Sequence, residues 1–264
     1  MKKIIIAITC LVAMAVALAG QDLKITYNNV MKLGRSRKST ITVYYTTQFW
    51  RTIDEEKDTL IDFGTFTSYE IDHKNKTIVR LELDDMIQLM DLFAAVAEEA
   101  KKEGKEINEA GNKLLKLSGG ESISVKKIGT EVVLGRTCEK WDVSLGKLKY
   151  VASVDPTLVR PMPPYDIERA RPLLEGLSWQ VQAMALGESL KKFREGVGQI
   201  TGVHLNSEVK LPLGPLTQTT TKKVTKIETG PLPASVFELP KGYTEEDVGK
   251  KMVEEISKRL GISY

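Results

Sequence analysis

The residues that could carry out chemistry are few and widely spaced. The cysteines are Cys10 and Cys138, and the histidines are His73 and His204. None of the four falls in a zinc-ligand spacing, and no nucleophile motif such as Gly-x-Ser-x-Gly lies beside a histidine. We therefore expect no metal site, no cofactor and no catalytic residue, and we interpret each histidine as a solvated or packed imidazole.

Two adjacent acids, Asp84 and Asp85, look like an acid–base pair, but their position favours a structural role. They directly precede apolar residues at helical spacing between Met86 and Ala97. Carboxylates at a helix start cap free N–H groups and complement the helix dipole. The pair therefore predicts a helix start. A hydrolase would need acids or histidines to converge from distant segments.

The first twenty residues have the order of a secretory signal peptide. Lys2 and Lys3 precede an apolar run, 4–19, which ends in small residues. We predict cleavage near Ala19/Gly20 and a periplasmic or secreted mature chain without a transmembrane span. An uncleaved anchor is the alternative, although the run is short for a span of roughly 20 residues. No cysteine follows the small residues, so we expect no lipidation.

Loss of this leader would remove Cys10 and leave Cys138 as the one thiol. A single thiol cannot form an internal disulfide, and we predict that Cys138 is a small buried apolar residue. The chain has 38 basic and 35 acidic residues. This near balance argues against a nucleic-acid partner, which requires a clustered basic surface.

After Asp22 the dominant pattern is the alternation of apolar and polar residues that is typical of β-strands. A hairpin turns at 73–76, and Gly146 marks a tight reversal. Helical spacing interrupts the strands. The predicted strands are 23–27, 41–45, 49–53, 59–63, 69–72, 77–83, 123–128, 131–134, 138–145, 147–154, 203–211 and 217–227. The predicted helices are 84–103, 107–117, 172–194 and 244–264.

This order predicts an α+β fold in which a single antiparallel β-sheet curves around helices packed on its concave face. If the sheet does not close fully, it forms a half-open, unclosed barrel. Residues 1–20 would be the signal peptide and 21–243 a single domain. Residues 244–264 would form a C-terminal amphipathic helix, opened by the acidic capping sequence Thr244-Glu245-Glu246-Asp247. That helix could cover its own domain or dock on a partner.

Two motifs carry a family resemblance. One is Gly-x-x-Cys, at Gly135 to Cys138, and the other is Phe-x-x-Pro-x-Gly-Tyr, at Phe237 to Tyr243. With the hairpin at 71–81, they resemble an uncharacterised family of secreted bacterial domains related to the periplasmic outer-membrane-lipoprotein carrier and lipid-transport superfamily. The resemblance implies a half-open barrel, closed by helices, with an apolar cavity for lipid or acyl chains. Arg51 is a candidate gate residue that the local pattern does not establish.

Apolar side chains of the predicted helices and of one strand could line such a cavity, because methionine adapts to irregular apolar ligands. The alternative is that they fill the core and leave no cavity. The candidate ligand-binding residues are Trp50, Met86, Met90, Phe93, Leu177, Val181 and Met184.

The sequence therefore predicts an exported, non-catalytic binding protein that holds a lipid or another hydrophobic ligand between sheet and helices. The alternative is an envelope protein–protein interaction module without a small-molecule ligand, which would engage its partner through a sheet edge or the final helix.

Overall fold

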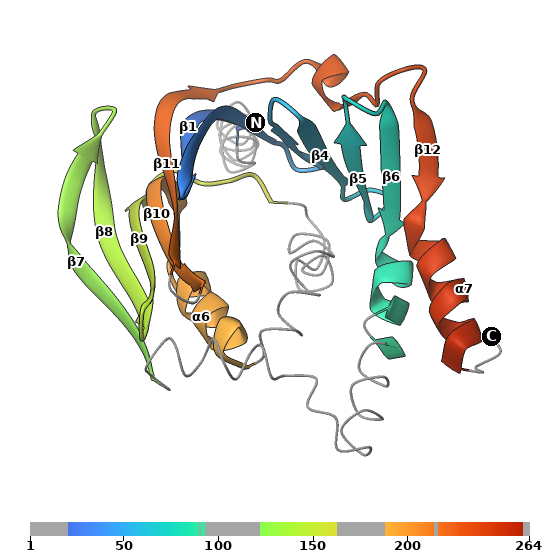
Figure 1. Cartoon of the computed structure of the whole chain (residues 1–264). Helices are drawn as coiled ribbons and strands as arrows, with labels where there is room; N and C mark the ends of the chain where they lie inside the picture. Colours follow the sequence, from blue (N-terminus) through green and yellow to red (C-terminus); the bar gives the residue numbers. More distant parts are fainter. Residues whose placement is uncertain (1–20, 90, 93–121, 163–187, 214–215, 261–264) are drawn as a thin grey trace, which may run out of the picture.

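A twelve-stranded β-sheet dominates the structure, which is a computed structural model. It describes residues 21–89, 91–92, 122–162, 188–213 and 216–260. The strands follow the order β12-β6-β5-β4-β3-β2-β1-β11-β10-β9-β8-β7. Figure 1 shows that the sheet curves into an arch, with α6 and α7 near the two ends of the arch.

The first six strands form an antiparallel meander, as the alternating pattern predicts. They are β1 (Leu23–Leu33), β2 (Arg35–Tyr45), β3 (Phe49–Ile53), β4 (Lys57–Asp62), β5 (Thr67–Asp72) and β6 (Thr77–Glu82).

Three further strands form a second meander, and two long strands join it to the first through the pairing of β1 with β11. These five are β7 (Ile123–Val133), β8 (Arg136–Leu145), β9 (Leu148–Asp155), β10 (Val203–Leu213) and β11 (Leu216–Thr229).

The predicted fold class is confirmed, because β12 and β7 lie at opposite ends of the strand order and the sheet stays unclosed. One detail of the prediction is wrong. Residues 244–247 do not open a helix but form strand β12 (Thr244–Asp247), which pairs in parallel with β6. Sequence pattern favoured helix because four polar residues have no strand alternation. The backbone of β6 offers an edge that pairs them regardless of side chain.

The strands between 123 and 154 differ slightly from the prediction. The predicted strands 123–128 and 131–134 are one strand, β7, with a register shift against β8 between Lys127 and Gly129. The shift is a β-bulge, which bends a strand without ending it. The predicted reversal at Gly146 is confirmed: its φ of 59° is a conformation that glycine adopts without strain.

Helices follow or precede the strands at the ends of the arch. Residues 83–89 and 91–92 are helical, with Asp84 and Asp85 in the first turn as predicted. The others are α6 (Glu188–Gly198), the short η1 (Ala234–Phe237) and α7 (Val248–Leu260). Asp247 caps α7, since its Oδ1 accepts the Lys250 N–H at 3.1 Å. In the described part of the chain, no helix has the length and apolar character needed to cross a membrane.

Buried side chains form three clusters. The α7 cluster joins β4, β6, the helical residues 83–89 and 91–92, and α7. It consists of Ile61, Phe63, Leu81, Leu83, Met86, Leu89, Leu92 and Val253. The central cluster consists of Leu23, Ile25, Tyr27, Val133, Cys138, Leu158, Val203, Leu205 and Val224. The α6 cluster consists of Val143, Leu145, Leu148, Tyr150, Ala152, Val154, Phe193 and Ile200.

Candidate functional site

The α7 cluster and the central cluster meet at two aromatic side chains. Tyr45 packs against the central cluster and Trp50 against the α7 cluster. The strand register places these residues directly opposite each other on β2 and β3. Their rings are 5.3 Å apart in an edge-to-face arrangement, and Trp50 makes the same contact with Phe63. Both side chains are only partly buried. Apolar packing therefore continues from one cluster to the other through this aromatic junction, Tyr45 and Trp50.

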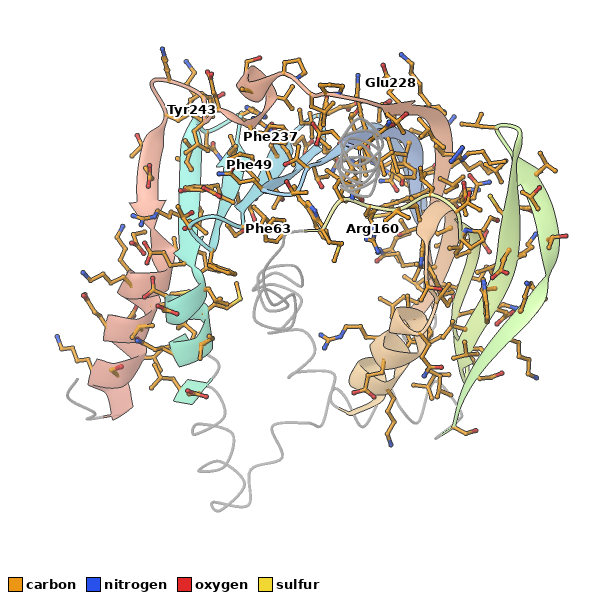
Figure 2. All side chains as sticks on the ribbon, turned by 180° about the vertical axis from the view of Figure 1, so that it is seen from behind. Phe49, Phe63, Arg160, Glu228, Phe237 and Tyr243 are labelled. Atoms are coloured by element: carbon orange, nitrogen blue, oxygen red, sulfur yellow. The ribbon has the colours of Figure 1, made fainter. Side chains whose placement is uncertain are left out.

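A cation lies over the aromatic junction. The guanidinium of Arg160 is 5.7 Å from the centre of the Trp50 ring, a distance typical of a cation–π contact. Figure 2 shows Arg160 on the same inner side of the arch as Phe63. Arg160 belongs to the segment 156–162, which leaves β9. Leu158 anchors this segment because its side chain is buried in the central cluster.

Neutral polar groups continue the site toward β9 and β10. The Tyr27 hydroxyl donates to the His204 carbonyl at 3.1 Å, and the Tyr150 hydroxyl contacts His204 Nδ1. Burial raises the pKa of Tyr27 and Tyr150. Burial lowers the pKa of His204 to about 4, and the charge of Arg160 acts in the same direction. At neutral pH both phenols and the imidazole are therefore uncharged.

His204 should make the stability depend on pH. Its folded-state pKa of about 4 lies below the ordinary 6.5, so the unfolded chain binds more protons between these values and loss of stability accompanies acidification. We expect the free energy of unfolding to fall by about 2 kcal/mol from pH 7 to pH 5, as measured by urea unfolding at each pH. In His204→Gln this pH dependence of the free energy of unfolding should disappear. If the free energy of the variant falls as steeply between pH 7 and pH 5 as that of the parent, His204 is not its cause.

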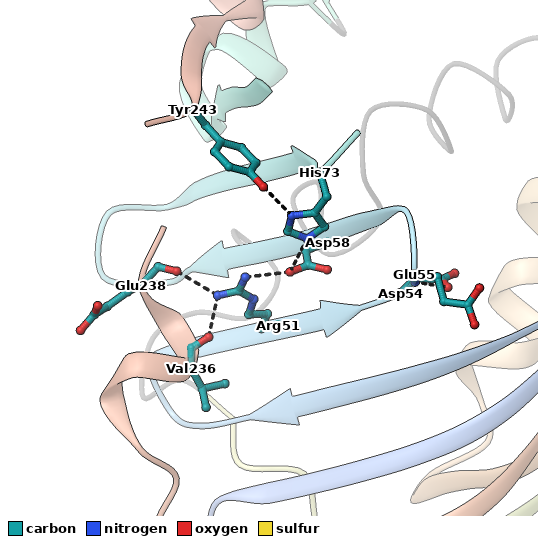
Figure 3. Close-up of polar contacts among 8 residues, drawn as sticks. All are labelled: Arg51, Asp54, Glu55, Asp58, His73, Val236, Glu238 and Tyr243. Atoms are coloured by element: carbon teal, nitrogen blue, oxygen red, sulfur yellow. Dashed lines mark hydrogen bonds and ion pairs between the residues drawn. The ribbon is translucent and has the colours of Figure 1, made fainter. Parts of the chain in front are cut away.

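A second polar cluster lies on the other face of the sheet. Because successive strand residues point to opposite faces, Arg51 points away from the side that Trp50 occupies. Its Nη2 donates to Asp58 Oδ2 at 2.7 Å, and its Nη1 donates to the carbonyls of Val236 and Glu238 at 2.7 and 2.9 Å. Figure 3 shows these bonds converging on one guanidinium. The Arg51 and Asp58 side chains are 9% and 3% exposed.

His73 and Tyr243 extend this outer cluster. His73 Nε2 is 3.1 Å from Asp58 Oδ2, and its Nδ1 is 3.1 Å from the Tyr243 hydroxyl. Residues 230–243, here called the crossover, connect β11 to β12 along the outer side of the arch (Figure 1). Phe237 of the crossover stacks on Phe49 with ring centres 5.1 Å apart. The outer cluster therefore fastens the crossover to β3 and β4. The gate role considered for Arg51 is not what this geometry provides.

Cys138 is the remaining residue that the sequence singles out for possible chemistry. Cys138 is a buried free thiol, and burial raises its pKa, which suppresses the reactive thiolate; its predicted role as a buried apolar residue is confirmed. Within the described ranges, no group of three or more His, Cys, Asp and Glu residues is placed to hold a metal ion.

Of the predicted cavity residues, the structure describes Trp50 and Met86 and brings both into contact with the α7 cluster. Met86 is fully buried. The others lie outside the described residues: Met90, Phe93, Leu177, Val181 and Met184. Sequence reasoning missed Arg160 and Tyr45. A usable signal was present, because Arg160 is the one charged residue in the proline-containing stretch 156–164.

No family model matches the chain, and the search of curated proteins found no match. Solved structures are similar to it at low identity. One is an uncharacterized conserved protein from Thermus thermophilus, with 9% identity and a TM-score of 0.43 over 91% of this chain and 98% of that one. A LolA superfamily protein from Nitrosomonas europaea has 8% identity and a TM-score of 0.31 over 83% of this chain and 90% of that one.

A third similar structure is the Pseudomonas aeruginosa MucA/MucB complex, with 12% identity and a TM-score of 0.37. The match covers 87% of this chain and 59% of that one, so this chain spans less than two thirds of its length. The superfamily named by the sequence resemblance is thus represented among the similar structures.

Proposed function

We propose that this protein is an exported, non-catalytic binding protein that holds a lipid or another hydrophobic ligand against the inner face of its arch. The observation that carries the proposal is the aromatic junction. There two buried apolar clusters join through Tyr45 and Trp50, which remain only partly buried. Burial of an acyl chain along this surface would gain about 25 cal/mol for each Å² of apolar area removed from water. No covalent chemistry is required.

The apolar inner face favours a ligand with a long chain over a compact one. Leu23 and Ile25 lie under one end of the junction, and Phe63 and Met86 lie under the other. Binding sites for such ligands are mostly apolar with few polar groups.

Binding can be tested directly on the purified, exported chain. Native extraction followed by mass spectrometry should reveal a co-purifying amphiphile, and titration with the fluorescent fatty acid cis-parinaric acid should saturate. An empty extract together with linear, unsaturable probe fluorescence would overturn the proposal.

Trp50→Ala should weaken binding of cis-parinaric acid about tenfold, because it removes one of the two side chains of the aromatic junction. Trp141→Ala is the matched control, since Trp141 lies on β8 and packs against the α6 cluster. The control should bind as the parent does. Equal loss in both variants would indicate general damage to the fold and would count against the assigned site.

A sheet edge favours a second candidate function, the envelope protein–protein interaction module. Strand β7 ends the strand order and exposes Ile128 and Val132, with 51% and 72% of their surface accessible. Unpaired edge strands recruit extended segments of other proteins. A crosslinker installed at Val132→Cys should then capture one defined envelope protein in cells. Val132→Lys should abolish binding of that protein without altering binding of cis-parinaric acid. Capture of no defined partner contradicts this candidate.

Deleting the final helix cannot separate the two functions. Residues 244–264 include β12, and Val253 of α7 is part of the α7 cluster. Their removal would open the core, so substitutions on the exposed residues of α7, such as Lys251 and Glu254, are the appropriate probes of docking.

A further inference from the structure

Arg160 is held in place by its own segment. Asp155 Oδ1 accepts the Thr157 and Leu158 N–H groups at 2.8 and 3.2 Å, which turns the chain out of β9. Leu158 is then buried in the central cluster. Pro161 restricts the backbone of Arg160 because a proline disfavours helical conformation in the preceding residue. The guanidinium is therefore directed over the aromatic junction by local structure.

In the described part of the chain, the groups on which this guanidinium acts carry no charge. It lies over the Trp50 ring. Burial raises the pKa of Tyr45, whereas the charge of Arg160 and its side-chain hydrogen bond to Tyr45 lower that pKa. Its charge also acts on Tyr27, Tyr150 and His204. Each of these is neutral at neutral pH.

Among the described residues, no carboxylate lies within ion-pair distance of Arg160. The acid in its own segment, Asp155, is 1% exposed and pairs with Arg136 at 2.5 Å. A guanidinium is always charged, and a partly buried charge gains stability from an opposite charge with hydrogen bonds. The inner face thus combines an apolar surface with a fixed cation at its aromatic junction.

We propose that Arg160 binds the anionic head group of an amphiphilic ligand, whose acyl chain lies along the inner face beside Trp50 and Tyr45. This inference rests on the proposed function and narrows its ligand class to single- or multiple-chain amphiphiles with a carboxylate or phosphate head. Guanidinium groups recognise both anions through paired N–H donors. Neutral esters and alcohols of the same chain length offer no negative charge to the guanidinium and bind less tightly.

The test compares cis-parinaric acid with its methyl ester at pH 8, below micelle-forming concentrations, on the purified exported chain. The parent should prefer the acid about tenfold. In Arg160→Gln the acid should weaken about tenfold, while the ester changes less than twofold. Arg160→Lys keeps the charge and should retain part of the preference. Competition by palmitate and by 1-palmitoyl lysophosphatidic acid identifies carboxylate or phosphate as the preferred head.

The outcomes separate this inference from the function on which it rests. If the parent binds neither probe, the proposed function fails and the inference fails with it. If the parent binds acid and ester equally, ligand binding stands and the role of Arg160 is overturned. If Arg160→Gln loses both probes to the same extent, with an unchanged circular dichroism spectrum, Arg160 supports the apolar surface and does not recognise the head group.

Discussion

Replacing Arg51 with methionine is expected to lower the free energy of unfolding by about 3–5 kcal/mol. The change would leave the Asp58 carboxylate, 3% exposed, without its guanidinium partner at 2.7 Å. It would also leave the Val236 and Glu238 carbonyls without the donors that reach them. A buried carboxylate that keeps only the His73 contact, at 3.1 Å, is costly, and the loss of two part-buried hydrogen bonds to the crossover adds to the effect. Guanidinium chloride unfolding measures the effect.

An exposed ion pair on the same protein supplies the matched control. Arg37 and Glu56 are 2.6 Å apart, but their side chains are 61% and 66% exposed. Arg37→Met should leave the unfolding midpoint unchanged, because exposed pairs contribute little. The double variant Arg51→Met/Asp58→Asn should recover part of the loss, since it no longer buries an unpaired charge. An Arg51→Met midpoint equal to the parent's would show that the outer cluster does not stabilise the fold.

Alanine at position 202 is expected to destabilise the fold by about 3–4 kcal/mol. Gly202 precedes β10 and has a φ of 111°, a conformation that side chains rarely adopt. A Cβ there would lie 2.6 Å from the Asp155 carbonyl oxygen and 2.9 Å from Val154 Cγ1. The carbonyl belongs to backbone and cannot rotate away, so the strain and the overlap add. Thermal and denaturant unfolding of Gly202→Ala measure the loss.

Gly198→Ala is the control for this change. Gly198 ends α6, and a Cβ built there meets no atom within 4 Å. Its substitution should leave stability unchanged or raise it by up to about 1 kcal/mol, since alanine favours helix. Equal stability of the two variants would mean that the backbone at Gly202 lies farther from the Asp155 carbonyl oxygen of β9 than the structure shows.

The two predictions concern different parts of the arch. The outer cluster, which includes Arg51, holds the crossover on the outer face (Figure 3). Gly202 lets β10 start close to β9, the two strands on which His204 and Tyr150 meet. We therefore expect the outer face to set stability and the inner face to bind.

Much of the fold was predictable because strand alternation is a local property. Leu23, Ile25 and Tyr27 point to one side of β1 by period alone, and the glycine at 146 marks a reversal by its conformational freedom. Strand β12 was not predictable, because its partner β6 lies far earlier in the chain, with Thr244 opposite Thr77. Its four polar residues carry no alternation, and only the free edge of β6 makes them a strand.

The features of the candidate site also divide into those that the sequence predicted and those that required the tertiary structure. The sequence by itself predicted that Cys138 is a buried thiol and that one antiparallel sheet curves around helices, and it offered Trp50 and Met86 as candidates for lining a cavity or filling the core. Only the tertiary structure decided that Tyr45 and Trp50 join two clusters, that Arg160 lies over them, and that Arg51 faces the crossover. The reason is physical: alternation assigns a face to each residue of one strand, whereas contacts between 50 and 160 or between 51 and 236 depend on how distant segments cross the sheet.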